Sequence, residues 1–376
     1  MNGPAVFLGH TAAPSGAELA TLRLLRTLRA HGAEVALVCT EDGPVMARAR
    51  DAGIDTRVVT GRFDSRAMTI GSGPLRLISG FLALLRLGWA VGGAVRDLRA
   101  RVLVAESTKA LVLGAVAARR ARVPLVWQVH DRVSRDYFGL LPATTIRLLA
   151  ALFCRGLLAN SHGTRETLPA RIPAVVAYPG VALPATPPPP RTRAAADAVV
   201  VVVGRLSPWK GQDVFLRALA AVPTRPAAVY FVGGTFFDEQ PFRQYLEQLA
   251  DELGLAVTFT GHVDDPHRYL AEADVLVHCS VLPEPFGQVV VEGMAAGCAV
   301  IATVPGGPAE IIADGRTGRL VPAGDEAALT AALTELLGDP AARARIAAAG
   351  AARARDFDIG TTARVVTRFL DEVAPP

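Results

Sequence analysis

Short runs of β-branched and other apolar residues alternate along the chain with longer stretches that are rich in alanine, leucine and arginine and have a helical period. This alternation is typical of βα units built on a parallel sheet, so the predicted fold class is α/β. In the first half of the chain we expect strands at residues 5–9, 34–40, 101–107, 124–130 and 156–161.

A proline-rich segment at residues 178–197 separates two such alternations, because neither a helix interior nor a central strand accommodates its proline run. A chain of 376 residues also exceeds what one hydrophobic core usually organises. The sequence therefore predicts two Rossmann-like domains facing each other across a cleft, at 1–185 and 186–355. In the second domain we expect strands at residues 198–206, 228–234, 256–262, 275–280, 299–303 and 318–322.

Residues 326–376 have a helical pattern that breaks at the segment RDFDIG. The last helix, within residues 356–376, has no sheet of its own left to cover, so we expect it to pack back on the amino-terminal domain. Asp356 and Asp358 resemble the acidic pair of metal-dependent transferases, but the simpler interpretation is that they cap this helix.

The most apolar window, residues 77–95, is long enough to test as a membrane span. Arg86 lies at its centre, where insertion would cost ~2.5–3.5 kcal/mol, so a covering helix of a soluble domain is favoured. The start of the chain, MNGPAVFLGH, lacks the basic and apolar regions of a signal peptide, and the four cysteines lie far apart. Both features favour a cytoplasmic protein with buried, reduced thiols.

Charge is unevenly distributed, although the whole chain carries only +4. Residues 1–180 hold 23 basic against 12 acidic residues, a balance of +11, whereas the remainder has a balance of −7. A clustered basic face would attract an acidic acceptor or an anionic membrane surface, so peripheral contact with the inner membrane face is one expectation. A solvated arginine surface explains the same balance. Nucleic acid is not an expected partner.

The first candidate site follows the strand expected at residues 5–9. The chain there reads HTAAPSGAELATLRLL, where a tight loop of small residues leads into a helix near Gly16. Backbone N–H groups at such a helix start favour an anion, although an ordinary strand-to-helix turn explains the segment equally well. The loop is not the GxGxxG fingerprint of dinucleotide-binding proteins.

The segment GRLSPWKG (204–211) follows the first strand of the second domain, at the end of the sheet where α/β proteins place their ligands. It holds Lys210, one of only two lysines among 39 basic residues. Arg205 and Lys210 reach one point beyond the strand end, where they would neutralise a diphosphate without a metal and stabilise it as a leaving group. Solvated surface charge is the alternative interpretation.

The segment LPEPFGQVVVEGMAAGCAVIAT (282–303) places Glu284 on a loop and Glu292 in the early turns of a helix that starts near Gly287. Both carboxylates then face one cleft and accept hydrogen bonds from sugar and ribose hydroxyls. The amides at Phe286, Gly287 and Gln288 would hold an anion at the helix start. An inert pair of surface acids is the alternative interpretation.

Four segments, GRLSPWKG, TGHVDD, PEPFGQVVVEGMAAGCAVIAT and GGPAEII, resemble in order, spacing and residue type the donor-nucleotide domain of retaining GT-B glycosyltransferases of family four. The resemblance covers the second domain almost continuously. In the first domain, PSGAE is similar to the family's glycine loop, VHD to its active-site histidine segment, and LANSHGTRETL to its last strand and helix.

The resemblance implies a retaining transfer of a sugar from a nucleoside diphosphate donor to a small-molecule, lipid or glycan acceptor. It implies no cofactor and no metal, and a UDP-sugar is favoured over a GDP-sugar. It assigns Arg205 and Lys210 to the diphosphate, Glu292 to the ribose, and Glu284 to the transferred sugar. The full set that it assigns to the donor is Gly16, Gly204, Arg205, Lys210, Val263, Glu284, Phe286, Gly287, Gln288 and Glu292, with His130, Arg205, Lys210 and Glu284 as catalytic residues.

Three of these residues lie outside the two segments that are assigned to the diphosphate and the sugar. Val263 would meet the base through its backbone, and Gly16 would approach the phosphates from the first domain. His130 would lie beside the donor sugar near the acceptor, whereas a lone histidine at a strand end is otherwise a structural group.

Two departures from the family pattern affect the expected packing. Gly293 stands where the family usually has alanine, which loosens a helix interior by ~1 kcal/mol. Ser15 stands where a second glycine is common, which narrows the room above the donor phosphates. A GT-B-fold nucleotide-sugar epimerase or pseudo-glycosyltransferase, and a non-catalytic nucleotide-sugar-binding protein, are the alternative functions.

Overall fold

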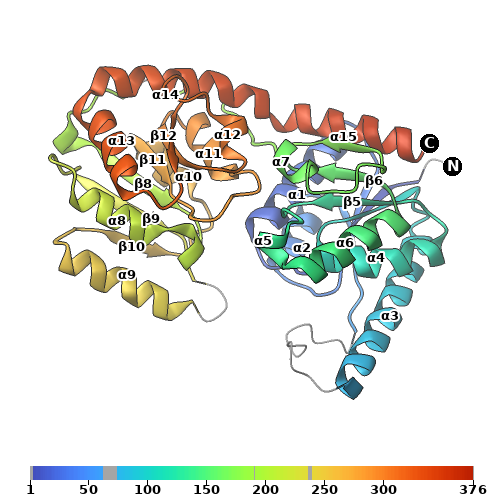
Figure 1. Cartoon of the computed structure of the whole chain (residues 1–376). Coiled ribbons are helices and arrows are strands. Elements are labelled where there is room, and N and C mark those ends of the chain that lie inside the picture. Colours follow the sequence, from blue (N-terminus) through green and yellow to red (C-terminus); the bar gives the residue numbers. More distant parts are fainter. Residues whose placement is uncertain (1–2, 62–73, 190, 236–238, 376) are drawn as a thin grey trace. The chain divides into compact units, whose positions relative to one another are not determined.

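The computed structural model describes residues 3–61, 74–189, 191–235 and 239–375 of the chain (Figure 1). It forms two compact units. The first comprises Met1–Gly180 together with Ile359–Pro376, and the second comprises Val181–Asp358. The boundary therefore lies five residues before the predicted one, and the start of the last helix lies three residues after its predicted position.

The described part of the first unit contains a seven-stranded parallel sheet in the order β3-β2-β1-β4-β5-β6-β7. The five expected strands are confirmed, with ends that differ by up to two residues. Their bounds are β1 (Ala5–Gly9), β2 (Val35–Cys39), β3 (Asp55–Val58), β4 (Val102–Ala105), β5 (Leu125–Val129), β6 (Cys154–Ala159) and β7 (Ala174–Val176).

Two strands of this sheet, β3 and β7, were not predicted, and both lie at its edges. The sequence of β3 is DTRV, with residues alternately exposed and half-buried, and β7 has only three residues. An edge strand needs no continuous apolar run, because one side of it meets solvent. The continuous apolar run by which the buried strands were predicted is therefore absent from β3 and β7.

Helices cover both faces of the first sheet. One face buries residues of α1, α2 and α15, and the other buries residues of α3, α4 and α6. Among the residues that the structure describes, no helix is long and apolar enough to cross a membrane. The bounds are α1 (Gly16–Ala30), α2 (Pro44–Asp51), α3 (Pro74–Asp97), α4 (Thr108–Ala121), α5 (Arg135–Phe138), α6 (Leu140–Phe153), α7 (His162–Arg165) and α15 (Ile359–Val373).

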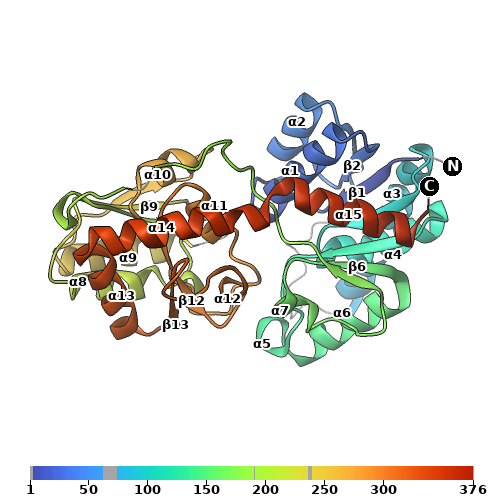
Figure 2. The same ribbon diagram turned by 90° about the horizontal axis from the view of Figure 1, so that it is seen from above.

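The last helix, α15, lies alongside α1, far from it in sequence (Figure 2). Its apolar residues Val366, Phe369 and Leu370 are buried with the core of the first sheet. Phe369 also fits over Gly156 of β6, where a Cβ atom would lie 2.7 Å from the phenyl ring. The carboxyl-terminal segment thus supplies one of the covering layers of the first unit.

The second unit contains a six-stranded parallel sheet within its described residues, in the order β10-β9-β8-β11-β12-β13. All six expected strands are confirmed. The strands are β8 (Val199–Val203), β9 (Ala228–Val232), β10 (Thr258–Gly261), β11 (Val275–His278), β12 (Ala299–Val304) and β13 (Arg319–Pro322). The helices are α8 (Gln212–Ala220), α9 (Gln240–Glu252), α10 (His267–Glu272), α11 (Gln288–Ala295), α12 (Pro308–Ile311), α13 (Glu326–Gly338) and α14 (Pro340–Ala354).

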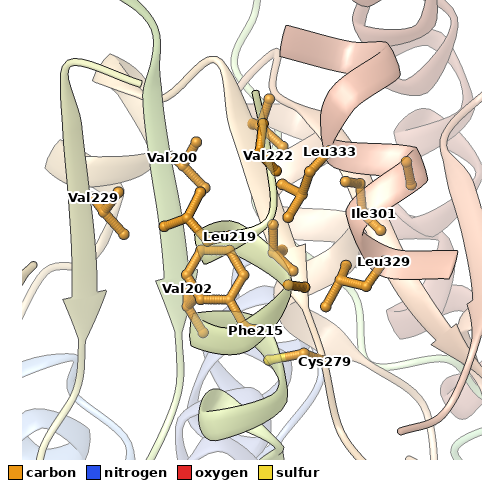
Figure 3. Packing of buried hydrophobic residues seen from close by; sticks show 14 of the residues in the cluster. Val200, Val202, Phe215, Leu219, Val222, Val229, Cys279, Ile301, Leu329 and Leu333 are labelled. Atoms are coloured by element: carbon orange, nitrogen blue, oxygen red, sulfur yellow. The ribbon is translucent and has the colours of Figure 1, made fainter. Parts of the chain in front are cut away.

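The largest core of this unit lies between the sheet and helices α8 and α13. Figure 3 shows Phe215 of α8 and Leu333 of α13 beside the strand residues Val200, Val202 and Ile301. All of these side chains are almost completely buried. The rigid layer fixes where the loops at the carboxyl ends of β8 and β11 begin.

The helix α11 approaches β11 more closely than an alanine at position 293 would allow. A Cβ atom at Gly293 would lie 2.2 Å from Cδ2 and 3.2 Å from Cβ of Leu276, which is fully buried. The expectation that Gly293 only loosens its helix is therefore incomplete, because glycine is what lets the helix pack on the sheet.

We predict that Gly293→Ala lowers the free energy of unfolding, measured by urea denaturation. Overpacking costs about 1–3 kcal/mol and outweighs the ~1 kcal/mol that alanine contributes to helix formation. A variant more stable than the wild type would show that Leu276 moves aside without cost.

Candidate functional site

The strand order of the second sheet reverses between β8 and β11, which are neighbours although β9 and β10 intervene in sequence. At such a switch point the loops after the two strands leave in opposite directions and open a crevice at their carboxyl ends. Gly204, Arg205 and Lys210 follow β8, and Glu284 follows β11. The fold thus brings these four predicted residues to one edge of the sheet.

Lys210 and Glu284 form an ion pair at this edge. The Nζ atom of Lys210 lies 2.6 Å from Oε2 of Glu284, and the two side chains are 19% and 15% exposed. The same Nζ atom lies 4.1 Å from the centre of the Trp209 ring. Ser280 donates to Oε2 of Glu284 at 3.0 Å, and Nε2 of His278 lies 3.1 Å from it. Oε2 of Glu284 is therefore within hydrogen-bond distance of three polar side chains.

The protonation of Glu284 follows from these neighbours. Burial by itself raises the pKa of a carboxyl group, but the positive charge of Lys210 and the hydrogen bond with His278 lower it more. The pKa of Glu284 is consequently held well below its usual range. At neutral pH this side chain is a carboxylate that accepts hydrogen bonds, and it is not a general acid.

Glycines allow the two loops of the site to meet. Gly211 has φ +66°, and a Cβ atom there would lie 2.1 Å from the carbonyl oxygen of Cys279. A Cβ atom at Gly307 would lie 2.3 Å from the Cα and carbonyl oxygen of Phe286. The Gly307 N–H also donates to the Glu284 carbonyl at 2.8 Å. The loop that carries Glu284 thus packs directly against the backbone that follows β12.

The helix α11 starts at Gln288, as predicted, with Gly287 as its amino-terminal cap at φ +97°. Gln288 donates from Nε2 to Oε1 of Glu292 at 2.7 Å, which orients this half-buried carboxylate. Phe286 is 3% exposed as a whole residue, and its ring packs on that of Phe357. The side chain of Phe286 is therefore part of the core and does not face a ligand.

Two further predicted residues, Arg205 and Val263, have other neighbours than Glu284. Arg205 pairs through Nε with Oε2 of Glu239 at 3.3 Å, a partner that the sequence analysis did not identify. Val263 follows β10, and β9 separates β10 from β8. Val263 therefore lies at the carboxyl end of the same sheet, after a strand two places from β8.

The first sheet has the same type of switch point, between β1 and β4. His10 after β1 lies with Nδ1 2.8 Å from Oγ of Ser107 after β4. Beside them, Oε2 of the buried Glu106 accepts a hydrogen bond from Thr21 and lies 3.3 Å from Nε2 of His130. His130 is therefore one member of a polar cluster at the carboxyl edge of the sheet.

The Glu106 carboxylate governs the charge of His130. Burial lowers the pKa of the imidazole, but the hydrogen bond and negative charge of Glu106 raise it more, and the net pKa lies above its ordinary value. We predict that Glu106→Gln lowers the pKa of His130 from its wild-type value, because burial is then opposed only by the charges of Asp131 and Glu18. An NMR titration of the imidazole protons measures this, and an unchanged pKa would mean that Glu106 does not control it.

Gly16 is the first residue of α1, with Ser15 at the cap position. No atom lies within 4 Å of a Cβ atom built at Gly16. The packing of the first unit therefore does not itself require glycine at this position. The sequence resemblance offers another reason for glycine at position 16, namely the close approach of a ligand.

Four partners of the predicted residues were not identified from the sequence. His278 and Glu106 offered a signal, because each is a polar group within or directly after an apolar strand and needs a partner when buried. Ser280 and Glu239 offered none, since hydroxyl and carboxylate residues are common in loops.

Two family models match the chain, one on each half. Residues 14–183 match the model described as "Glycosyltransferase Family 4", and residues 189–353 match "Glycosyl transferases group 1". The second match includes the Lys210–Glu284 pair together with Gly211 and Gly307. The chain belongs to this family of glycosyltransferases. The resemblance drawn from the motifs is confirmed.

Solved structures agree with this family membership. Alr3699/HepE of Anabaena, crystallised with UDP and glucose and with UDP-glucose, is 28% identical, with TM-scores of 0.85 and 0.84 over 98% of this chain and all of that one. The predicted GT-B fold class, with its two parallel-sheet α/β domains, is confirmed.

Curated relatives include enzymes that act on inositol lipids. The phosphatidyl-myo-inositol mannosyltransferase of Mycolicibacterium smegmatis is 27% identical over 96% of this chain and 91% of its own length. A GDP-mannose-dependent alpha-(1-6)-phosphatidylinositol monomannoside mannosyltransferase of the same organism is 35% identical over 40% of this chain and 42% of its own length. With several other curated relatives, the match spans a little under half of the relative's own length.

Proposed function

We propose that the chain is a retaining glycosyltransferase that moves a sugar from a nucleoside diphosphate donor to a hydroxyl group of an acceptor held by the amino-terminal domain. The observation that carries this proposal is the Lys210–Glu284 pair at the switch point of the second sheet. It places a cation and a hydrogen-bond acceptor side by side where α/β sheets bind nucleotides.

Lys210 and Arg205 bind the diphosphate in this mechanism. An ammonium group has three N–H donors, and Glu284 uses one of those of Lys210, so others are available to phosphate oxygens. The positive charge also stabilises the diphosphate as the glycosidic bond breaks. This neutralisation is the reason for proposing that transfer proceeds without a metal ion.

Glu284 binds the transferred sugar in this proposal. Because its carboxylate is ionised, it accepts hydrogen bonds from sugar hydroxyls and does not protonate the leaving group. Its Oε2 atom already accepts hydrogen bonds from Lys210 and Ser280, which weakens it as a nucleophile. Transfer on the front face of the sugar, through an oxocarbenium-like state, therefore accounts better for retention than a covalent intermediate does.

A UDP-sugar is the favoured donor, and a polyol is the favoured acceptor. The Anabaena relative binds UDP and UDP-glucose, whereas one mycobacterial relative is named as GDP-mannose-dependent, so a GDP-sugar is the second candidate. Relatives named for phosphatidylinositol and inositol phosphate support a polyol acceptor. The four cysteines are free and buried, which agrees with a reducing, cytoplasmic compartment.

We predict that Glu292→Gln raises the dissociation constant of the nucleoside diphosphate roughly 10–100-fold, because a charged hydrogen bond to the ribose contributes about 1.5–3 kcal/mol. Calorimetry measures this constant. Glu247→Gln, on the surface of α9, is the matched control and should bind as the wild type does. Equal binding by the two variants would remove Glu292 from the ribose site.

The proposed reaction is tested with radiolabelled UDP-glucose and GDP-mannose and a panel of inositol, inositol phosphate and phosphatidylinositol acceptors. We expect nucleotide release that depends on one acceptor, and an α-linked product by NMR. An inverted anomer would overturn retention. Turnover of the donor without an acceptor would indicate the epimerase alternative, and donor binding without any turnover would indicate the binding protein.

A further inference from the structure

One helix of the first unit exposes a regular apolar stripe. On α6, Leu141 is 79% exposed, Leu148 is 58% exposed and Leu152 is 63% exposed. With Thr145, these positions recur at intervals of three and four residues, which places them on one side of the helix. The opposite side of α6 buries Ala143, Ile146 and Ala150 in the core, so the stripe points away from the sheet.

The neighbouring helices α3 and α4 add one aromatic and two arginine side chains. Helices α3, α4 and α6 bury residues in the same core, and α4 contacts both α3 and α6, so the three helices cover the same face of the sheet (Figure 1). On α3, Trp89 is 58% exposed, and the guanidinium group of Arg120 on α4 lies 4.7 Å from the centre of its ring. Arg119 lies 5.2 Å from the ring of Phe153 on α6. We call this surface the α3–α4–α6 face.

The charge on these three helices has almost only one sign. By sequence they carry seven basic residues and one acidic residue, Asp97 at the end of α3. The helix α6 carries no acidic residue, and neither does α4. Arginines with exposed leucines and a tryptophan combine the two interactions that hold a protein on an anionic bilayer, apolar insertion and attraction to lipid phosphates.

From these observations we propose that the α3–α4–α6 face docks on the surface of a bilayer that contains anionic lipids. Leu141, Leu148 and Leu152 insert between the headgroups, and Trp89 lies at their level. Arg119 and Arg120 contact the lipid phosphates. The inference concerns binding to lipid alone and holds whether or not the proposed transfer is correct.

A second copy of the chain fits this face less well than a lipid surface does. In a twofold dimer the same patch occupies both sides of the interface, so the arginines would face each other. The three helices offer only Asp97 to offset them. An anionic bilayer supplies the opposite charge over the whole face.

The test is flotation of the full-length protein, without any donor, with vesicles of phosphatidylcholine alone and of phosphatidylcholine with 30% phosphatidylglycerol. We expect binding to the anionic vesicles that weakens at high salt. The double variant Arg119→Gln/Arg120→Gln should lose roughly 30-fold in partition coefficient, since each basic residue contributes about a fivefold factor. Leu148→Gln/Leu152→Gln should also lose binding, and both of its positions are exposed enough to leave the fold unchanged.

The matched control lies on the other face of the same unit. Arg364 and Arg368 are exposed on α15, and Arg364→Gln/Arg368→Gln removes the same charge without touching the α3–α4–α6 face. This control should bind anionic vesicles as the wild type does. Equal losses in both arginine variants, no binding of the wild type, or a dimer in solution that Leu148→Gln/Leu152→Gln dissociates would each overturn the proposal.

Discussion

Replacing Lys210 by alanine is expected to weaken nucleoside diphosphate binding by roughly 10–100-fold, because a hydrogen bond to a charged group contributes about 1.5–3 kcal/mol. The substitution also leaves Glu284 without its cation. We expect the free energy of unfolding to fall by roughly 1–2 kcal/mol, less than for a fully buried pair, since both side chains are partly exposed and Ser280 still donates. Calorimetry and urea denaturation measure the two effects.

The other lysine of the chain provides the control. Lys109 is exposed at the start of α4, and Lys109→Ala should bind the nucleotide as the wild type does. Wild-type binding by Lys210→Ala would remove this residue from the diphosphate site.

The pH dependence of stability gives a readout of the same pair that does not depend on activity. Because the pKa of Glu284 is depressed in the folded state, its contribution to stability is complete at neutral pH and is lost as the pH falls toward that pKa. Without Lys210 the pKa of Glu284 rises, so the variant should lose less stability than the wild type on acidification. If the free energy of unfolding fell equally with decreasing pH in the wild type and in Lys210→Ala, Lys210 would not control the pKa of Glu284.

Replacing Gly307 by alanine is expected to disable the site through the backbone. The new Cβ atom would lie 2.3 Å from backbone atoms of Phe286, whose buried ring prevents the loop from retreating. Because a displacement of about 1 Å can cost 100-fold in rate, we expect kcat/KM for transfer to fall at least 100-fold. Overpacking should also lower the free energy of unfolding by about 1–3 kcal/mol.

Gly338→Ala is the matched control for this substitution. No atom lies within 4 Å of a Cβ atom at Gly338, the last residue of α13. The control should keep its activity and be as stable as the wild type or up to ~1 kcal/mol more stable. If Gly307→Ala has the same activity as this control, the contact between Gly307 and the loop that carries Glu284 is not needed to position the site.

The sequence predicted the central strands and the carboxylate and cation positions for a common reason. Strands such as β8, with five consecutive valines, are buried on both faces and leave a continuous apolar run. The segments that carry Arg205, Lys210 and Glu284 follow such strands directly. A parallel sheet places everything that follows its strands at one edge, so proximity could be inferred without coordinates.

The partners within the site could not be predicted in the same way. The contact between Glu284 and His278 depends on a loop that packs against Gly307, after β12. The role of Glu106 depends on the adjacency of β4 and β5. These are pairings between separate segments, and periodicity within one segment says nothing about them. The close approach of Gly293 to Leu276 is also a contact between separate segments. From the sequence, only the low helix propensity of glycine could therefore be inferred at this position.

The measurement that most directly tests the central claim is a calorimetric titration of the purified chain with UDP, GDP, ADP and TDP, each with magnesium and with EDTA, in parallel with Lys210→Ala. The account predicts that one nucleoside diphosphate, with UDP favoured, binds with the same affinity in magnesium and in EDTA, and that Lys210→Ala weakens this binding. Binding that requires magnesium would contradict the metal-independent mechanism. Failure of all four to bind would contradict the assignment of the Lys210–Glu284 pair to a nucleotide donor.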